Sequence, residues 1–267
     1  MLRCLVRGCG DVGSAVAHAL FVAGHRVAIH DVPGPTYPRR GMAFVDTMFD
    51  GRATLEGVMS KRAPDLPHLL EMTECGRAIP MVSADLQATL AAIQPDVLID
   101  ARMRKREIPE RQAGLAPLTI GLGPNFIAGL TTDVVVETAR GDHLGEIIHS
   151  GPSLPFEGGP RMIAGHGRGR FVYAPCAGQF ETALALGTEV APNEPIGTID
   201  DRTIRAPMRG TLVGLTRNGV LVGRGAKIVE VDPRCNPRLA FGIGERPARI
   251  AAGVLKAVGS SGFVVAA

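Results

Sequence analysis

Tryptophan is absent from this chain of 267 residues, and aromatic residues make up only 4% of it. Lysine is also scarce, because only four of the 29 basic residues are lysines and the rest are arginines. Nucleic-acid binders usually combine a concentrated basic face with aromatic side chains on which bases stack. The net charge is only +3 and most arginines are scattered, so we expect no nucleic acid among the partners.

Long hydrophobic runs and paired cysteine motifs are missing as well. The apolar stretch at 1–24 is interrupted by Arg7 and Asp11, which leaves no run as long as a membrane-spanning helix requires. The five cysteines form neither a C-x-x-C motif nor a metal-ligand spacing, a pattern typical of reducing compartments. We therefore expect a cytoplasmic protein with no membrane partner and no metal site.

Glycine and proline, in contrast, are abundant, with 34 and 20 residues. Together they fill about a fifth of the chain, against roughly 12% in ordinary proteins. Hydrophobic residues reach 45%, which is enough to bury a core and excludes a disordered chain. The turn-forming residues indicate many short elements, and the length allows two domains.

The first thirty residues follow the pattern of a dinucleotide-binding unit. A strand-like run leads into the motif Gly8-Cys9-Gly10-Asp11-Val12-Gly13, and apolar residues then recur at helical spacing up to Gly24. A second strand-like run ends at Asp31. Glycines at the G-x-G-x-x-G positions allow a tight turn, a close approach of backbone to a pyrophosphate, and helix–strand packing. The pattern predicts a Rossmann-like nucleotide- or cofactor-binding domain over residues 1–150.

Asp11 complicates the choice of ligand. A carboxylate directly after the second glycine suits the helix dipole but competes with a bound phosphate. Asp11 either caps the helix, or marks a site that is not tuned for NAD and faces a different ligand or a proton-transfer step. If NAD is the ligand, Asp31 would bind its ribose hydroxyl.

Three further segments are candidates for an anionic ligand. The only dense basic cluster is 102–106, directly after a strand-like run, and a second glycine-rich loop lies at 121–126. The pair Arg39-Arg40 could clamp a phosphate or a carboxylate, although solvated surface arginines remain the alternative for both basic segments. No catalytic residue and no metal ligand is assigned. The predicted cofactor-binding residues are Gly8, Cys9, Gly10, Asp11, Val12, Gly13, Asp31, Arg39, Arg40, Arg102, Lys105, Gly121, Gly123 and Asn125.

An internal repeat follows a Gly/Pro-rich linker at 151–170. Ala174-Pro175 matches Ala206-Pro207 and Gly178 matches Gly210, at an offset of 32 positions. The two copies resemble the halves of a biotinyl/lipoyl-type barrel-sandwich hybrid, which predicts such a domain at 171–233. A swinging-arm carrier needs a lysine in the hairpin between the halves, and the hairpin at 200–203 has none. Residues 234–267 are expected to pack back on the first domain.

The predicted fold class is therefore α/β. We expect an N-terminal Rossmann-like parallel-sheet domain, followed by a mainly β barrel-sandwich-hybrid domain of the biotinyl/lipoyl type.

An ordered series of short segments resembles the YqeB-type accessory proteins of the selenium-dependent molybdenum hydroxylase system. The segments are Val-Arg-Gly-Cys-Gly-Asp-Val-Gly at 6–13, Arg39-Arg40, Pro-Asp-Val-Leu-Ile-Asp-Ala at 95–101, Ile-Gly-Leu-Gly-Pro-Asn-Phe at 120–126, Glu-Thr-Ala-Arg-Gly-Asp-His-Leu-Gly at 137–145, Arg-Ala-Pro-Met-Arg-Gly at 205–210 and Val-Asp-Pro-Arg at 231–234. The glycine loop of this family carries an aspartate at the position of Asp11, so the resemblance accounts for the presence of Asp11.

The resemblance implies a maturation factor for molybdenum-cofactor hydroxylases. Such a factor would bind a molybdopterin-type cofactor, or a dinucleotide such as NAD(P), in the crevice beside the glycine loop, and a molybdenum hydroxylase would be its client. An NAD(P)-binding oxidoreductase and a non-enzymatic docking module for a client enzyme remain the alternatives. A Tyr-x-x-x-Lys motif is absent, and no other catalytic constellation is identifiable, which favours a role other than catalysis.

Overall fold

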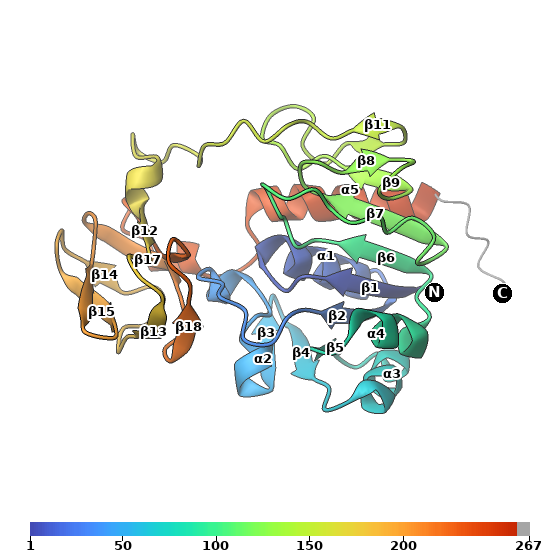
Figure 1. Ribbon diagram of the computed structural model, residues 1–267, viewed down its shortest axis with the longest axis horizontal. Helices are drawn as coiled ribbons and strands as arrows, with labels where there is room; N and C mark the ends of the chain where they lie inside the picture. Colours follow the sequence, from blue (N-terminus) through green and yellow to red (C-terminus); the bar gives the residue numbers. More distant parts are fainter. Residues whose placement is uncertain (261–267) are drawn as a thin grey trace. The chain divides into compact units, whose positions relative to one another are not determined.

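The computed structural model describes residues 1–260, and these residues form two compact units. The first contains Met1–Pro33, Asp46–Phe156 and the chain from Ile243 onward, and the second contains Gly34–Val45 and Glu157–Gly242 (Figure 1). The chain thus enters the second unit twice, whereas the sequence predicted domains in series with boundaries at 150, 170 and 233. The difference arises because the segment at 34–45 is an irregular, proline-containing stretch, and such a stretch carries no periodicity that tells which core it joins.

A nine-stranded sheet forms the centre of the first unit, in the order β10-β9-β7-β6-β1-β2-β5-β4-β3. Its strands are β1 (Arg3–Arg7), β2 (Arg26–His30), β3 (Arg52–Leu55), β4 (Val58–Arg62), β5 (Ile79–Val82), β6 (Val97–Asp100), β7 (Leu118–Leu122), β9 (Val134–Val136) and β10 (Ile147–Ile148). The strands from β9 to β4 are parallel, whereas β10 and β3 pair antiparallel at the two edges. A separate antiparallel pair joins β8 (Ile127–Ala128) and β11 (Gly151–Pro152).

The predicted fold class, a Rossmann-like parallel sheet followed by a barrel-sandwich hybrid, is wrong. The protein has a mixed α/β fold with one large mixed sheet and several antiparallel sheets. Hydrophobic runs locate buried strands but do not determine their partners or directions, and the two antiparallel edge strands contain polar or very short segments that such runs miss.

Helices α3 (Leu66–Cys75) and α4 (Leu86–Ile93) cover one face of the sheet. Leu69 of α3 and Leu90 and Ile93 of α4 form one buried cluster with Leu5 of β1, Ala28 of β2 and Leu98 of β6. Each helix begins at an aspartate, because Asp65 and Asp85 accept hydrogen bonds from the backbone N–H groups three residues further on. The first unit also contains the short helix α2 (Thr47–Asp50).

Helix α1 (Asp11–Val22) follows β1 directly, and α5 (Glu245–Ser260) packs against it. Gly253 permits the close approach of α5 to the chain beside it: a Cβ atom at this position would lie 2.3 Å from the carbonyl oxygen of Gly145. For Gly259, on the same helix, no atom of the described residues lies within 4 Å of the Cβ position.

We predict that Gly253→Ala and Gly259→Ala change stability in opposite directions. Alanine favours a helix over glycine by up to about 1 kcal/mol, so Gly259→Ala is expected to stabilise the protein slightly. At Gly253 the overpacking against Gly145 is expected to cost roughly 1–3 kcal/mol and to outweigh this gain. Chemical denaturation of the two variants measures the sign of each change in the free energy of unfolding. A stabilised Gly253→Ala protein would contradict the close packing of α5.

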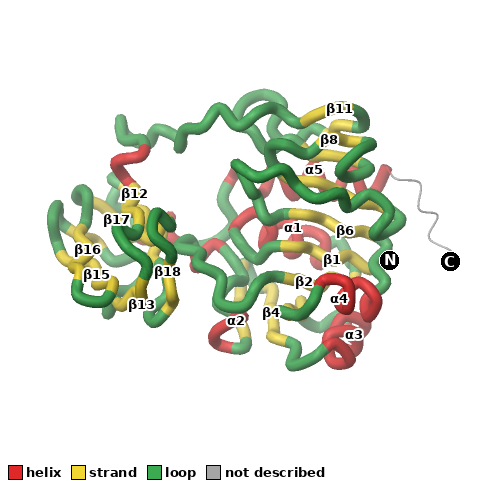
Figure 2. Tube along the Cα trace, in the orientation of Figure 1, coloured by secondary structure: helices red, strands yellow, loops and turns green. Residues whose placement is uncertain are grey.

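The second unit consists of two four-stranded antiparallel sheets, in the orders β12-β19-β17-β14 and β16-β15-β13-β18 (Figure 2). Their strands are β12 (Phe171–Tyr173), β13 (Gly178–Glu181), β14 (Glu189–Val190), β15 (Pro195–Ile199), β16 (Arg202–Arg205), β17 (Gly210–Leu215), β18 (Val220–Val222) and β19 (Lys227–Asp232). Short 3-10 turns occur at η1 (Arg40–Met42), η2 (Arg168–Arg170) and η3 (Pro237–Ala240).

The 32-residue offset relates the two sheets of the second unit strand by strand. Advancing by 32 positions takes β12 to β16, β13 to β17, β14 to β18 and β15 to β19. Exchanging the two members of every pair converts the strand order of one sheet into that of the other. Gly178 and Gly210 begin equivalent strands with φ values of 157° and 159°. The sequence repeat thus corresponds to an internal pseudo-symmetry.

Within residues 1–260, no helix is both long enough and apolar enough to cross a membrane.

Candidate functional site

The loop between β1 and α1 is shaped by its glycines. Gly8 has a φ of 109°, and its N–H donates to the carbonyl of His30 at 2.9 Å. A Cβ atom on Gly13 would lie 2.0 Å from the carbonyl oxygen of Gly8, so the first turn of α1 lies directly against the loop. Gly10 is the N-cap residue, and no side chain within the described residues caps α1 there.

The carboxylate of Asp31 holds this loop from the end of β2. One of its oxygens accepts from the N–H of Cys9 at 2.6 Å, and the other accepts from the N–H of Val32 at 2.7 Å. Burial raises the pKa of the Cys9 thiol well above its usual value, and the nearby charge of Asp31 raises it further. Cys9 is therefore a neutral packing residue and not a nucleophile.

Asp11, at the start of α1, accepts a hydrogen bond from the N–H of Val12 at 2.8 Å. Its carboxylate therefore stays close to the positive end of the helix dipole.

Ionisable side chains are aligned across the carboxyl ends of three neighbouring strands. The parallel register pairs Arg7 of β1 with His30 of β2 on one side and with Asp100 of β6 on the other. Arg7 and Asp100 lie two residues beyond Leu5 and Leu98, and side chains two apart on a strand share a face, so they point to the side that α3 and α4 cover. Arg7 is 5% exposed and Asp100 is 1% exposed.

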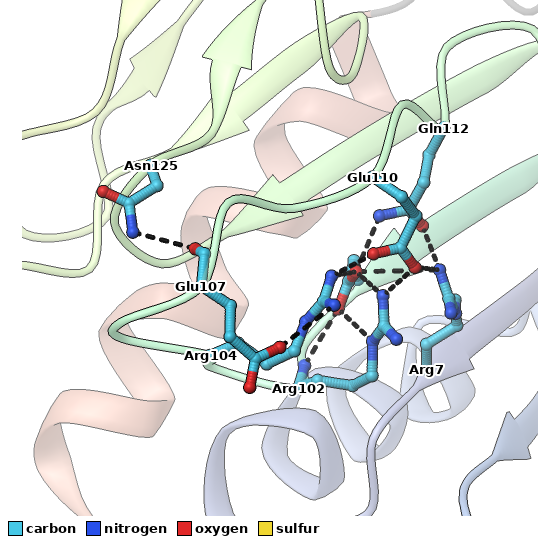
Figure 3. Close-up of polar contacts among 8 residues, drawn as sticks. Arg7, Arg102, Arg104, Glu107, Glu110, Gln112 and Asn125 are labelled. Carbon is cyan, nitrogen blue, oxygen red and sulfur yellow. Dashed lines mark hydrogen bonds and ion pairs between the residues drawn. The ribbon is translucent and has the colours of Figure 1, made fainter.

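Residues after β6 complete this cluster (Figure 3). Arg102 binds the carboxylate of Asp100 through both Nε and Nη2. Gln112 joins the two buried charges, because it donates to Asp100 at 2.6 Å and accepts from Arg7 at 2.8 Å. Glu110 accepts from Arg102, from Arg104 and, at 3.0 Å, from Arg7. We call Arg7, Arg102 and Arg104, together with Asp100, Glu110 and Gln112, the arginine cluster.

Both acids of the arginine cluster are ionised at neutral pH. Burial raises the pKa of Asp100, but the hydrogen bonds and charge of Arg102, with the charge of Arg7, lower it by more. Burial likewise raises the pKa of Glu110, but hydrogen bonds from Arg102 and Arg104 together lower it by more and hold it well below its usual range. Burial lowers the pKa of His30, and the positive charge of Arg7 adds to this, so the imidazole beside the cluster is neutral.

The second glycine-rich loop lies beside the segment that carries the arginine cluster. Asp100 of β6 and Gly121 of β7 form the last pair in the register of these two strands. Gly123 has a φ of 123° with Met103 beside it, and the side-chain amide of Asn125 donates to the carbonyl of Glu107 at 3.0 Å (Figure 3).

The other predicted basic residues have different surroundings. The ammonium group of Lys105 lies 5.2 Å from the centre of the Phe156 ring. Arg39 and Arg40 belong to the second unit, where Arg39 binds the carboxylate of Glu230 and Arg40 donates to the carbonyl of Leu215. Of the predicted site residues, the first unit therefore brings together the glycine loop, Asp31, Arg102 and the loop at 121–125.

Sequence reasoning missed four members of the cluster: Arg7, Asp100, Glu110 and Gln112. Two of them carry a signal that could have identified them, because a charged residue that ends an apolar strand needs a partner once it is buried. Arg7 ends one such run and Asp100 another. Glu110 and Gln112 lie in an irregular segment and carry no comparable signal.

Comparison with known proteins gives one strong similarity. No family model matches the chain. It is 36% identical over 254 residues to the curated "Uncharacterized protein YqeB" of Escherichia coli (strain K12). The match covers 95% of this chain and 47% of that protein, so the chain spans about half the length of the curated relative.

Similarity to solved structures is weak. The ectoine utilization protein EutE (DoeB) from Ruegeria pomeroyi is 13% identical, with 86% of this chain and 84% of that chain covered and a TM-score of 0.26. An aspartoacylase family protein from Mesorhizobium loti is 10% identical with the same coverage and the same TM-score. Scores this low carry no argument about the fold or the activity of this chain.

Proposed function

Because the chain belongs to the YqeB-type family, we propose that it is an accessory protein for molybdenum-cofactor hydroxylases. In this proposal it binds a phosphorylated ligand of the pterin-dinucleotide or nucleotide class at the loop between β1 and α1, and it serves a molybdenum hydroxylase as its client.

The position of the glycine loop is the observation that carries the ligand part of this proposal. From β1 the chain continues to β2 and β5 on one side of the sheet, and it then returns to β6 on the other side of β1. In open sheets with parallel strands, ligands bind outside the carboxyl ends of the strands where the order reverses in this way. The loop at Gly8–Gly13 follows β1 at this point.

The chemistry of the loop suits an anion. The first N–H groups of a helix lack partners within the helix and attract negative charge. In α1 the Asp11 carboxylate accepts from the N–H of Val12, and no side chain within residues 1–260 caps the helix at Gly10. Glycine at positions 8 and 13 lets the loop pack closely against the backbone at 101–102 and against the first turn of α1, which holds the loop at the start of the helix. The arginine cluster adds positive charge beside the loop, because a Cβ atom on Gly8 would lie 3.1 Å from the backbone nitrogen of Arg102.

The proposal is tested by what the full chain retains when it is produced in cells that make molybdopterin. We predict that the purified protein carries a pterin, detected as its fluorescent oxidation product after denaturation. A molybdenum hydroxylase is expected to co-purify with it. Titrations with NADH and NADPH form the comparison, since tight binding of either with no retained pterin would contradict the molybdenum role and favour the oxidoreductase alternative.

A further inference from the structure

The carboxylate of Glu110 lies among three guanidinium groups at the carboxyl ends of β1 and β6. It accepts from the Nη2 atoms of Arg102 and Arg104 and lies 3.0 Å from Nη1 of Arg7. Guanidinium groups that converge on one carboxylate are also the groups that proteins use to hold a phosphate.

The two acids of the arginine cluster differ in how firmly they are held. Asp100 is 1% exposed and belongs to strand β6, where Arg102 and Gln112 bind its carboxylate. The side chain of Glu110 is 45% exposed and belongs to the segment 101–117, which contains no helix or strand. When Glu110 leaves the cluster, Arg7 loses one partner but keeps Gln112 and Asp100, whereas the loss of Asp100 would remove the buried carboxylate itself.

One buried donor of the cluster has no acceptor. The side chain of Arg7 is only 6% exposed. Its Nε atom is buried and makes no hydrogen bond within the described residues. A buried donor without a partner is costly, and it indicates a group that a ligand can satisfy.

We propose that Arg7, Arg102 and Arg104 form a phosphate-binding site, which the carboxylate of Glu110 occupies in this structure and from which a phosphate group of the ligand displaces it. The site itself is independent of the glycine loop. Only the further step, that this phosphate and the group bound at Gly8–Gly13 belong to one ligand, rests on the proposed function.

Charge favours a phosphate over a carboxylate as the occupant. Within the arginine cluster, three arginines face two carboxylates while Glu110 is in place and Asp100 alone once Glu110 is displaced. The other carboxylate nearby, Glu107, lies outside the cluster, since it is 67% exposed and 3.4 Å from Arg104. The excess then equals two positive charges, which a phosphate dianion neutralises, whereas a ligand carboxylate would only replace Glu110 by a group of the same charge.

Two substitutions in the same segment separate displacement from a general change in charge. Glu110→Gln removes the competing charge, so we expect inorganic phosphate to bind this variant at least about tenfold more tightly than the unaltered protein. Glu107→Gln is the matched control, because the side chain of Glu107 is 67% exposed and its carboxylate pairs, among the described residues, with Arg104 alone, at 3.4 Å. It is expected to change phosphate affinity by less than about twofold, since exposed pairs contribute little.

Calorimetric titration of the full chain with inorganic phosphate measures these affinities, and sulfate is expected to compete with phosphate. Arg104→Gln is expected to abolish binding. The rise of the thermal midpoint of the unaltered protein with phosphate concentration gives a readout that needs no variant. Equal affinities in the Glu110→Gln and Glu107→Gln proteins, or unchanged binding by Arg104→Gln, would overturn the proposal. Phosphate binding that follows this pattern in a protein that retains no pterin would uphold the site and contradict only the proposed function.

Discussion

Replacement of Glu230 by glutamine is expected to destabilise the second unit by about 3–5 kcal/mol, the usual cost of removing one partner from a buried ion network. Glu230 is 1% exposed and holds three cations. Arg39 binds it through two hydrogen bonds of 2.9 and 2.7 Å, Arg170 binds it at 3.1 Å, and Lys227 at 2.6 Å. Because Arg170 is itself only 1% exposed, the substitution would leave a buried guanidinium without its carboxylate.

This network also joins distant parts of the chain within the second unit. Arg39 lies in Gly34–Val45, the first of the two segments that make up this unit, whereas Lys227 and Glu230 lie on β19. The 32-residue offset pairs Glu230 with Thr198 of β15, so the buried carboxylate is an addition to only one of the two equivalent sheets. We infer that it fixes the segment at 34–45 to the sheet that contains β19.

Tyrosine fluorescence during denaturation of the full chain measures this effect. The chain contains no tryptophan, and both tyrosines, Tyr37 and Tyr173, lie in the second unit, so the signal reports that unit. Glu189→Gln, at an exposed position of β14, is the matched control and is expected to leave the midpoint unchanged. A Glu230→Gln protein with the midpoint of the control would contradict the role of the network.

The effect of Glu230 should also depend on pH. Burial raises the pKa of its carboxyl group, but the hydrogen bonds and charges of Arg39 and Lys227 lower it by more, to well below its usual range. A carboxyl group with a lowered pKa in the folded protein stabilises it above the unfolded pKa, about 4.3, and loses this contribution as the pH falls below that value. The difference between the unaltered and Glu230→Gln proteins is therefore expected to be largest at neutral pH and to shrink in acid.

Substitution of Gly13 by alanine is expected to weaken the binding of a nucleoside diphosphate at least about 100-fold, or about 2.7 kcal/mol. The new Cβ would lie 2.0 Å from the carbonyl oxygen of Gly8, a distance that no backbone tolerates. Either the carbonyl of Gly8 or the first turn of α1 must move. Such a movement displaces the N–H groups that the proposed ligand would meet and strains the hydrogen bond from Gly8 to His30.

Calorimetry with ADP and CDP measures this loss. Gly259→Ala is the control, because it adds the same methyl group to a helix at a position where no residue within 1–260 comes within 4 Å of it. Circular dichroism of both variants shows whether the fold persists. A Gly13→Ala protein that binds as tightly as the control would exclude the glycine loop as the ligand site.

The glycine loop is the part of the candidate site that could be predicted from the sequence. Its strand, turn and helix are consecutive, so a local pattern identifies all three, and Asp31 follows at the end of the next strand. The family could also be predicted from short ordered motifs, and the match to YqeB confirms it. The molybdenum-related role stays a proposal.

The arginine cluster could not be predicted in the same way. Arg7 and Asp100 meet only because β1 and β6, which lie far apart along the chain, pair in parallel with one particular register. Arg102 was expected to be available to an anion, but its guanidinium is held by Asp100 and Glu110. Local patterns show neither register nor pairing direction. For the same reason the sequence did not reveal the antiparallel edge strands, and the predicted fold class was wrong.

The most direct test of the ligand site is a calorimetric titration of the unaltered full chain with ADP and CDP beside their nucleosides, adenosine and cytidine. If the carboxyl ends of β1 and β6 bind a phosphorylated ligand, at least one of the two diphosphates should bind about 100-fold more tightly than its nucleoside. Binding that is equal for diphosphate and nucleoside, or absent for both diphosphates, would contradict the proposed site.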